Sequence, residues 1–202
     1  MKSIDSQIYN RILKKKRGTL IIPEDFSEFG SSGAIRIALH RLVANDKIKR
    51  VAQGIYVRPK HSDLIGEMLP TTDEIAKAIA KRDRSRIIPT GSFALNVLGL
   101  STQVPMNYVY LTDGAPRKIQ LKGGSIKFKK TTPRNLAAKG KISGLVIQAL
   151  KEIGKDKVEE WEMKRIIKLL KEEKKEDLEH DIKLAPEWIR VIMKKALEHG
   201  CL

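Results

Sequence analysis

The residues of this chain best suited to chemistry with a ligand lie between Ser31 and Leu42, where basic and small side chains recur at helical spacing. At 100° per residue, Ile35, Leu39 and Leu42 fall on one side of a predicted helix, and the other side is polar and basic. Arginine can bond a guanine edge through two parallel hydrogen bonds, and the major groove of DNA admits one helix. The stretch therefore predicts a DNA-reading helix, whose candidate contact residues are Ser31, Ser32, Arg36, Ile37, His40 and Arg41. An ordinary helix with a solvated basic face is the alternative interpretation.

A β-hairpin is predicted directly after this helix. Two extended segments, 48–52 and 55–58, flank the dipeptide Gln53-Gly54, and a two-residue connection that contains glycine suits a tight hairpin. A basic ribbon next to a reading helix can hold the phosphates of DNA. The hairpin adds Lys49, Arg50 and Gln53 to the candidate contact residues.

The elements expected before the reading helix complete a known order. Ser3 is a candidate N-cap for a helix over residues 4–16, Thr19–Ile22 predicts a short strand, and Pro23 opens a short helix. Helix, strand, helix, helix and two strands is the order of a winged helix-turn-helix, so a DNA-binding domain is predicted over residues 1–62. Its predicted core consists of Ile8, Ile12, Ile22, Phe26, Leu39, Leu42, Val51 and Ile55.

A second domain is predicted over residues 70–202. Alternating and helical periodicities indicate a small mixed sheet over about 85–130 and helices over about 141–200. The predicted fold class is therefore α+β, with an N-terminal winged helix-turn-helix followed by a mixed α/β module with a helical C-terminus.

Three local features of the second half are interpreted from their composition. The turn-forming residues of 61–70 indicate a linker, and Thr71-x-x-Glu74 predicts a capping box that opens the next helix. A helix over 157–173 is expected to pack through a stripe that includes Trp161. The interleaved glutamates and lysines of 171–179 are interpreted as its solvated end.

A second hairpin, over residues 118–129, carries a row of lysines. Lysine and apolar residues alternate on both sides of Gly123-Gly124, which predicts one apolar and one basic face. Such a row is typical of a solvated sheet face that discourages edge pairing, although a positive net charge around it also favours an anionic partner. The candidate second basic surface comprises Lys118, Lys122, Lys127 and Lys129.

Charge is distributed unevenly along the 202 residues, whose formal net charge is +16. Residues 1–60 hold 13 basic and 5 acidic residues, residues 61–140 hold 13 and 6, and residues 141–202 hold 14 and 13. The first two thirds are therefore expected to bind a polyanion. A single cysteine, Cys201, excludes a disulfide framework, and no run of about 18 apolar residues occurs, so we expect a cytoplasmic protein without a membrane partner.

Gly91-Ser92 is the one motif that invites an enzymatic interpretation. Nucleotidyltransferases place Gly-Ser at the start of a helix, ahead of paired carboxylates that hold Mg²⁺. The first acidic residue downstream is Asp113, and Leu111 and Ala115, two residues away on either side, are not acidic. Gly91 and Ser92 are therefore predicted only to open a helix. We predict no catalytic residue, no metal site and no cofactor, and a protein that is not an enzyme.

Two motifs carry a resemblance to a known family. The first is the hairpin ending Gly54-Ile55-Tyr56-Val57-x-Pro59, and the second, at 91–105, has the form G-x-x-A-L-x-x-L-G-L-x-T-Q-x-P. In combination they resemble the AbiEi-like antitoxins, the antitoxin components of type IV toxin-antitoxin (abortive infection) systems. The closing segment Leu184-Ala185-Pro186-Glu187-Trp188-Ile189 extends the resemblance over nearly the whole chain.

The resemblance implies two activities. The N-terminal domain would repress its own operon at inverted repeats in double-stranded operator DNA, and the C-terminal domain would counter a nucleotidyltransferase-like toxin without a stable complex. No oligomeric state is implied. Two alternatives stay open: a stand-alone winged-helix transcriptional regulator whose second domain senses a ligand or dimerises, and a nucleotidyltransferase-like enzyme.

Overall fold

The computed structural model describes residues 3–64 and 66–198, so Cys201 lies outside the described residues. Contacts between Cα atoms divide the chain into two compact units, residues 1–79 with 119–122 and residues 80–118 with 123–202. The fold is mixed α+β and becomes helical toward the C-terminus, as predicted. Among the described helices, none is both long and apolar enough to span a membrane.

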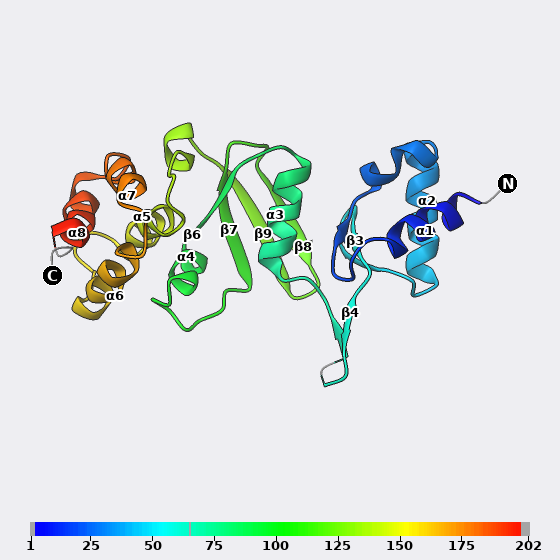
Figure 1. The fold of residues 1–202 in the computed structure, drawn as a ribbon, viewed down its shortest axis with the longest axis horizontal. Coiled ribbons are helices and arrows are strands. Elements are labelled where there is room, and N and C mark those ends of the chain that lie inside the picture. Colours follow the sequence, from blue (N-terminus) through cyan, green and yellow to red (C-terminus); the bar gives the residue numbers. More distant parts are fainter. Residues whose placement is uncertain (1–2, 65, 199–202) are drawn as a thin grey trace. The chain divides into compact units, whose positions relative to one another are not determined.

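Residues 4–57 of the first unit combine two α-helices with a three-stranded sheet (Figure 1). The strand order is β1-β3-β2, and both strand pairs are antiparallel. The sequence of elements agrees with the predicted order, although the first helix ends three residues before the expected Lys16. The elements are α1 (Ile4–Leu13), β1 (Leu20–Ile21), the 3₁₀ helix η1 (Pro23–Phe29), α2 (Ser32–Ala44), β2 (Lys49–Ala52) and β3 (Ile55–Val57).

The core of the first unit differs from the predicted core at two positions. Ile21, not Ile22, is buried, because side chains alternate along β1 and Ile21 points inward. Val51 is only partly buried, since the register of β2 against β3 shifts between Arg50 and Ala52 and brings Ala52 opposite Ile55. The predictions for Ile22 and Val51 are therefore wrong. The other predicted core residues, Ile8, Ile12, Phe26, Leu39, Leu42 and Ile55, are buried.

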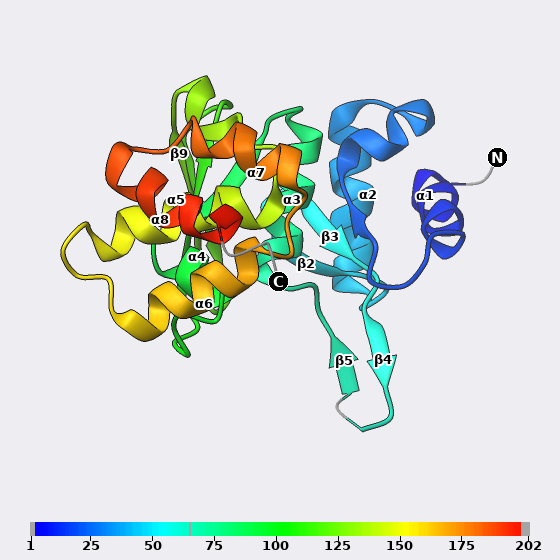
Figure 2. The ribbon, with the colours of Figure 1, turned by 60° about the vertical axis from the view of Figure 1, so that its left-hand side comes forward.

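Residues 60–62 and 66–68 form a ribbon in the region where the sequence predicted a linker. Strand β4 (Lys60–Ser62) pairs antiparallel with β5 (Gly66–Met68), and Figure 2 shows both strands projecting away from α1 and α2. Strands of three residues are too short to display a recognisable alternation, which is why the ribbon was missed. The next helix, α3 (Thr72–Arg82), opens with the predicted capping box, in which Thr71 N donates to Glu74 Oε2 at 2.7 Å and Glu74 N donates to Thr71 Oγ1 at 3.2 Å.

The chain also forms a four-stranded sheet with the order β6-β7-β9-β8, which belongs to the second unit except for residues 119–121 of β8. β6 and β7 are antiparallel, whereas β7 and β9 are parallel. Aromatic rings link the sheet to the helix after β6: the centroid of the Phe93 ring lies 4.5 Å from that of Tyr108 and 5.7 Å from that of Tyr110. The strands are β6 (Ile87–Thr90), β7 (Asn107–Thr112), β8 (Arg117–Leu121) and β9 (Gly124–Lys130).

Helices make up the remainder of the second unit. Figure 1 shows α5 between strand β6 and the helices α6 to α8. The apolar core here is formed mainly by residues of α5, α6 and α8, such as Leu150, Ile166 and Ile189. The helices are α4 (Ser92–Val97), the 3₁₀ helix η2 (Pro133–Leu136), α5 (Lys141–Ile153), α6 (Glu160–Leu170), α7 (Lys175–Ile182) and α8 (Glu187–Glu198).

Two predictions for the C-terminal helices are wrong. The charged run 171–179 is not one solvated helix end, because α6 stops at Leu170 and a separate helix, α7, buries Leu178 and Ile182. Trp161 is 51% exposed. It lies about 140° around the helix from the buried Ile166, five residues later, and therefore points away from the core.

Candidate nucleic-acid interface

Helix α2 has one buried and one exposed side. Ile35, Ala38, Leu39 and Leu42 pack into the core of the first unit, as their spacing predicted. The opposite side faces solvent and is called the α2 face below. It consists of Ser32, Arg36, Ile37, His40 and Arg41, all of which are exposed.

The N-terminus of α2 is open. Ser31 is the N-cap, and its Oγ accepts a hydrogen bond from Ala34 N at 3.3 Å. Ser31, Ser32 and Gly33 are all exposed, and a Cβ added at Gly33 would meet no atom within 4 Å. Free amides and the positive end of the helix dipole favour an approaching anion. The backbone at this end of α2 can therefore be approached closely.

The cations of the α2 face differ in their partners. Arg41 Nη1 lies 3.5 Å from Asp5 Oδ2, so helix α1 already supplies it with a counter-charge. Arg36 has no carboxylate within 4.0 Å among residues 3–64 and 66–198. Ile37 beside it is 56% exposed, which is unusual for a large apolar side chain between cations. The side chains of Arg36 and Ile37 are thus available to an external partner.

The β2–β3 hairpin places its polar residues in different situations. Lys49 Nζ lies 2.8 Å from Asp46 Oδ1, and this hydrogen bond and charge raise the pKa of Lys49 and lower the pKa of Asp46. Lys49 is therefore less free for a phosphate than the sequence prediction assumed, and its i,i+3 spacing from Asp46 was an available signal. Arg50 and Gln53 are exposed, and Gln53 leads into the turn at Gly54, where φ is 69°.

The candidate second basic surface is exposed along two strands and the turn between them. Lys127 and Lys129 alternate with the buried Ile126 and Phe128 on β9, so both point to one side of the sheet. Lys118 on β8 and Lys122 directly after it are exposed as well. The alternation predicted from the sequence is thus the pattern of burial on β9.

The Gly91-Ser92 motif opens a helix, as predicted. Gly91 is the N-cap of α4 with φ 64°, and Phe93 and Ala94 are buried. Asp113 is engaged by Arg86, whose backbone N and Nε donate to its two carboxylate oxygens at 2.7 and 2.8 Å. These hydrogen bonds lower the pKa of Asp113. In the described part of the chain, no three His, Cys, Asp or Glu side chains are grouped as metal ligands would be.

The comparisons with known proteins give one family. A search of the curated proteins finds no match to this chain. A family model described as a family of unknown function, DUF6088, matches residues 7–178. The match covers most of the chain, including parts of both units. The chain therefore belongs to the DUF6088 family.

Proposed function

We propose that the segment from α1 to β3 is a winged helix-turn-helix that binds double-stranded DNA, with α2 in the major groove and the β2–β3 hairpin as the wing. The observation that carries this proposal is the α2 face. There an exposed isoleucine and an arginine without a carboxylate partner in the described part of the chain follow a helix N-terminus open to an anion. The order of elements and the basic composition of residues 1–60 support it.

Each residue of this surface has a distinct proposed contact. Arg36 bonds a guanine edge through two hydrogen bonds, and Ile37 contacts a thymine methyl group. Arg41 contacts a phosphate, and its ion pair with Asp5 is either kept or broken in the complex. On the wing, Arg50 and Gln53 contact phosphates, whereas Lys49 contributes less because Asp46 neutralises it.

The resemblance to the AbiEi-like antitoxins extends the proposal beyond DNA binding. In this account the protein represses its own operon at inverted repeats and counters a nucleotidyltransferase-like toxin without a stable complex. We assign the antitoxin activity to the second unit. Its exposed lysines on β9, Lys127 and Lys129, are the residues we expect to take part.

The DNA-binding proposal is tested by selecting binding sites from a random duplex pool and measuring affinity by gel shift. Arg36→Ala should weaken binding to the selected site by about 1–3 kcal/mol and relax specificity at one base. Lys168→Ala, which removes an exposed cation from α6, is the matched control and should change nothing. Equal affinity and specificity in wild type and Arg36→Ala would place the DNA surface elsewhere.

The antitoxin proposal is tested separately, by growth rescue in cells that express the toxin-like reading frame next to this gene. The wild type and Arg36→Ala should both rescue growth, because repression and neutralisation belong to different units. Replacing Lys127 and Lys129 with glutamate should abolish rescue. Failure of the wild type to rescue would remove the antitoxin activity and leave the DNA-binding proposal standing.

A further inference from the structure

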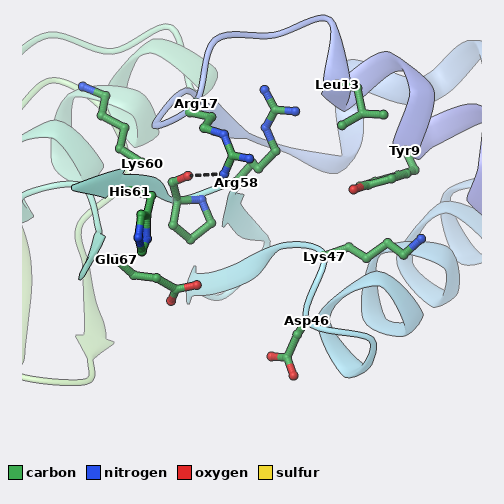
Figure 3. Close-up of a pocket in the computed structure, with 10 residues that line it drawn as sticks. Tyr9, Leu13, Arg17, Asp46, Lys47, Arg58, Lys60, His61 and Glu67 are labelled. Carbon is green, nitrogen blue, oxygen red and sulfur yellow. Dashed lines mark hydrogen bonds between the residues drawn. The ribbon is translucent and has the colours of Figure 1, made fainter. Parts of the chain in front are cut away.

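The first unit contains a cleft of about 540 Å³ that no proposed DNA contact uses. Its walls come from α1, the turn after α2, the end of β3 and the β4–β5 ribbon (Figure 3). Four cations line it: Arg17, Lys47, Arg58 and Lys60. No residue of the α2 face lines this cleft, so it is distinct from the proposed DNA surface.

The two arginines of the cleft are held by backbone carbonyls. Arg17 Nη1 donates to Pro59 O at 3.2 Å, the hydrogen bond drawn in Figure 3, and Arg58 Nη2 donates to Lys15 O at 2.9 Å. The Nε of Arg58 is buried and has no hydrogen-bond partner in the described part of the chain. Each guanidinium has five N–H donors, so most of this donor capacity is still open. The buried Nε of Arg58 is out of reach of a ligand, so an anion in the cleft would meet the other N–H donors of the two guanidinium groups.

The two lysines are positioned without carboxylates. Lys47 Nζ lies 4.5 Å from the centroid of the Tyr9 ring, a cation–π contact that leaves its charge uncompensated. Lys60 lies across Gly18, where a Cβ would meet Lys60 Cε at 2.5 Å. Within residues 3–64 and 66–198, no carboxylate approaches any of the four cations within 4.0 Å.

The acidic residues of the cleft do not cancel this charge. Asp46 and Glu67 line it, but Asp46 is already bonded to Lys49 at 2.8 Å. Four cations against two carboxylates give the cleft a net positive charge. A bound anion would compensate that charge.

We propose that this cleft binds the phosphate group of a small phosphorylated molecule. Guanidinium groups match phosphate oxygens in geometry as well as in charge. The volume falls in the range of small-molecule sites, about 300–1,000 Å³. Leu13, the Tyr9 ring and Pro59 provide an apolar wall for the organic part of the ligand. The phosphate lies at Arg17 and Arg58, and Lys60 lines the same cleft.

Isothermal titration calorimetry on the full chain tests this inference with adenosine 5′-monophosphate as the probe and adenosine as its phosphate-free counterpart. The monophosphate should bind at one site, and adenosine should not bind. Arg17→Gln should weaken monophosphate binding by about tenfold or more. Lys16→Gln removes a neighbouring cation that does not line the cleft and should bind like wild type. Absence of monophosphate binding at millimolar concentration, or equal binding in Arg17→Gln, would overturn the proposal.

Two further measurements keep the result interpretable. Lys60→Gln is a second variant for the case that Arg17→Gln lowers the melting temperature, and it should lose affinity in the same way. Titration in the presence of the selected duplex DNA separates a small-molecule site from a DNA phosphate contact. Simultaneous binding of monophosphate and duplex supports the proposal. Displacement of the monophosphate by DNA, with Arg17→Gln losing both ligands, would assign the cleft to the DNA surface and overturn it.

Discussion

Helices α2 and α5 have the same length, 13 residues each, but their N-termini are capped in different ways. At α5, Glu173 Oε2 accepts from Ile142 N at 2.6 Å and from Ser143 N at 3.0 Å, and Asp181 Oδ2 accepts from Gly140 N at 2.9 Å. At α2, the side chain of Ser31 is the cap and the first turn is open to solvent. The chain thus supplies internal anions where a helix is structural and leaves the N-terminus free where we propose an external one.

The two helices also differ in the side chains that they bury and expose. α5 buries polar as well as apolar residues, and its Gln148 lies 3.5 Å from the Thr90 hydroxyl of β6. α2 buries only apolar residues and exposes its cations. Mutations in α5 should therefore act on the free energy of unfolding, whereas those on the α2 face should act on binding.

The largest expected effect is at Asp181, which is fully buried. It accepts from Lys139 N at 2.9 Å and from Ser143 Oγ at 2.5 Å in addition to Gly140 N. Asp181→Ala leaves these donors buried without an acceptor, so it should lower the free energy of unfolding by about 3–5 kcal/mol. Urea denaturation measures the free energy of unfolding, and Glu176→Ala, at an exposed position, is the control. A loss below about 1 kcal/mol would show that Asp181 does not hold the α5 N-terminus.

Alanine at two glycines should shift stability in opposite directions. A Cβ at Gly140 would collide with Ser143 and Glu173, so Gly140→Ala should destabilise by about 1–3 kcal/mol. A Cβ at Gly33 meets open space inside a helix, so Gly33→Ala should stabilise by about 0.5–1 kcal/mol. The same methyl group should weaken DNA binding, because it narrows the approach to α2. Thermal unfolding and gel shift measure the two effects, and a destabilised Gly33→Ala would contradict the open α2 N-terminus.

Removing the cap of α2 should have a moderate effect on folding. Ser31→Ala deletes the acceptor for Ala34 N and should cost about 1 kcal/mol in the free energy of unfolding. Ser32→Ala, one residue later, removes an exposed hydroxyl and serves as control. Denaturant titration measures the free energy of unfolding of both variants. An effect of equal size in the two variants would show that Ser31 is not the cap that matters.

The smallest expected effect concerns the salt dependence of DNA binding. Arg50→Ala should reduce the slope of log affinity against log salt by about one, as expected for one lost phosphate contact. Lys49→Ala should change it less, because Asp46 already binds Lys49. Gel shifts at several salt concentrations compare the two. A larger change for Lys49→Ala than for Arg50→Ala would mean that DNA displaces Asp46.

Local signals explain what the sequence could and could not predict. The spacing of Ile35, Leu39 and Leu42 and the cap at Ser3 are properties of neighbouring residues, so the first helices could be located. The β4–β5 ribbon has strands too short for a pattern.

Helix α7 could not be recognised within its charged run. Its Asp181 is buried because it caps the N-terminus of α5, which is about forty residues away along the chain. The candidate cleft could not be predicted from the sequence either. Its arginines, Arg17 and Arg58, meet only because the segment after α1 contacts the segment after β3, and the lack of carboxylate partners in the described part of the chain is a tertiary property.

The most direct test of the central claim is nuclear magnetic resonance mapping of backbone amide shifts in the full chain during titration with the selected duplex. The account predicts that the largest shifts fall on residues 31–41 and 49–53 and that amides 140–147, at the capped end of α5, do not move. Shifts concentrated on β9, or spread over the α5 N-terminus while residues 31–41 stay unchanged, would contradict it.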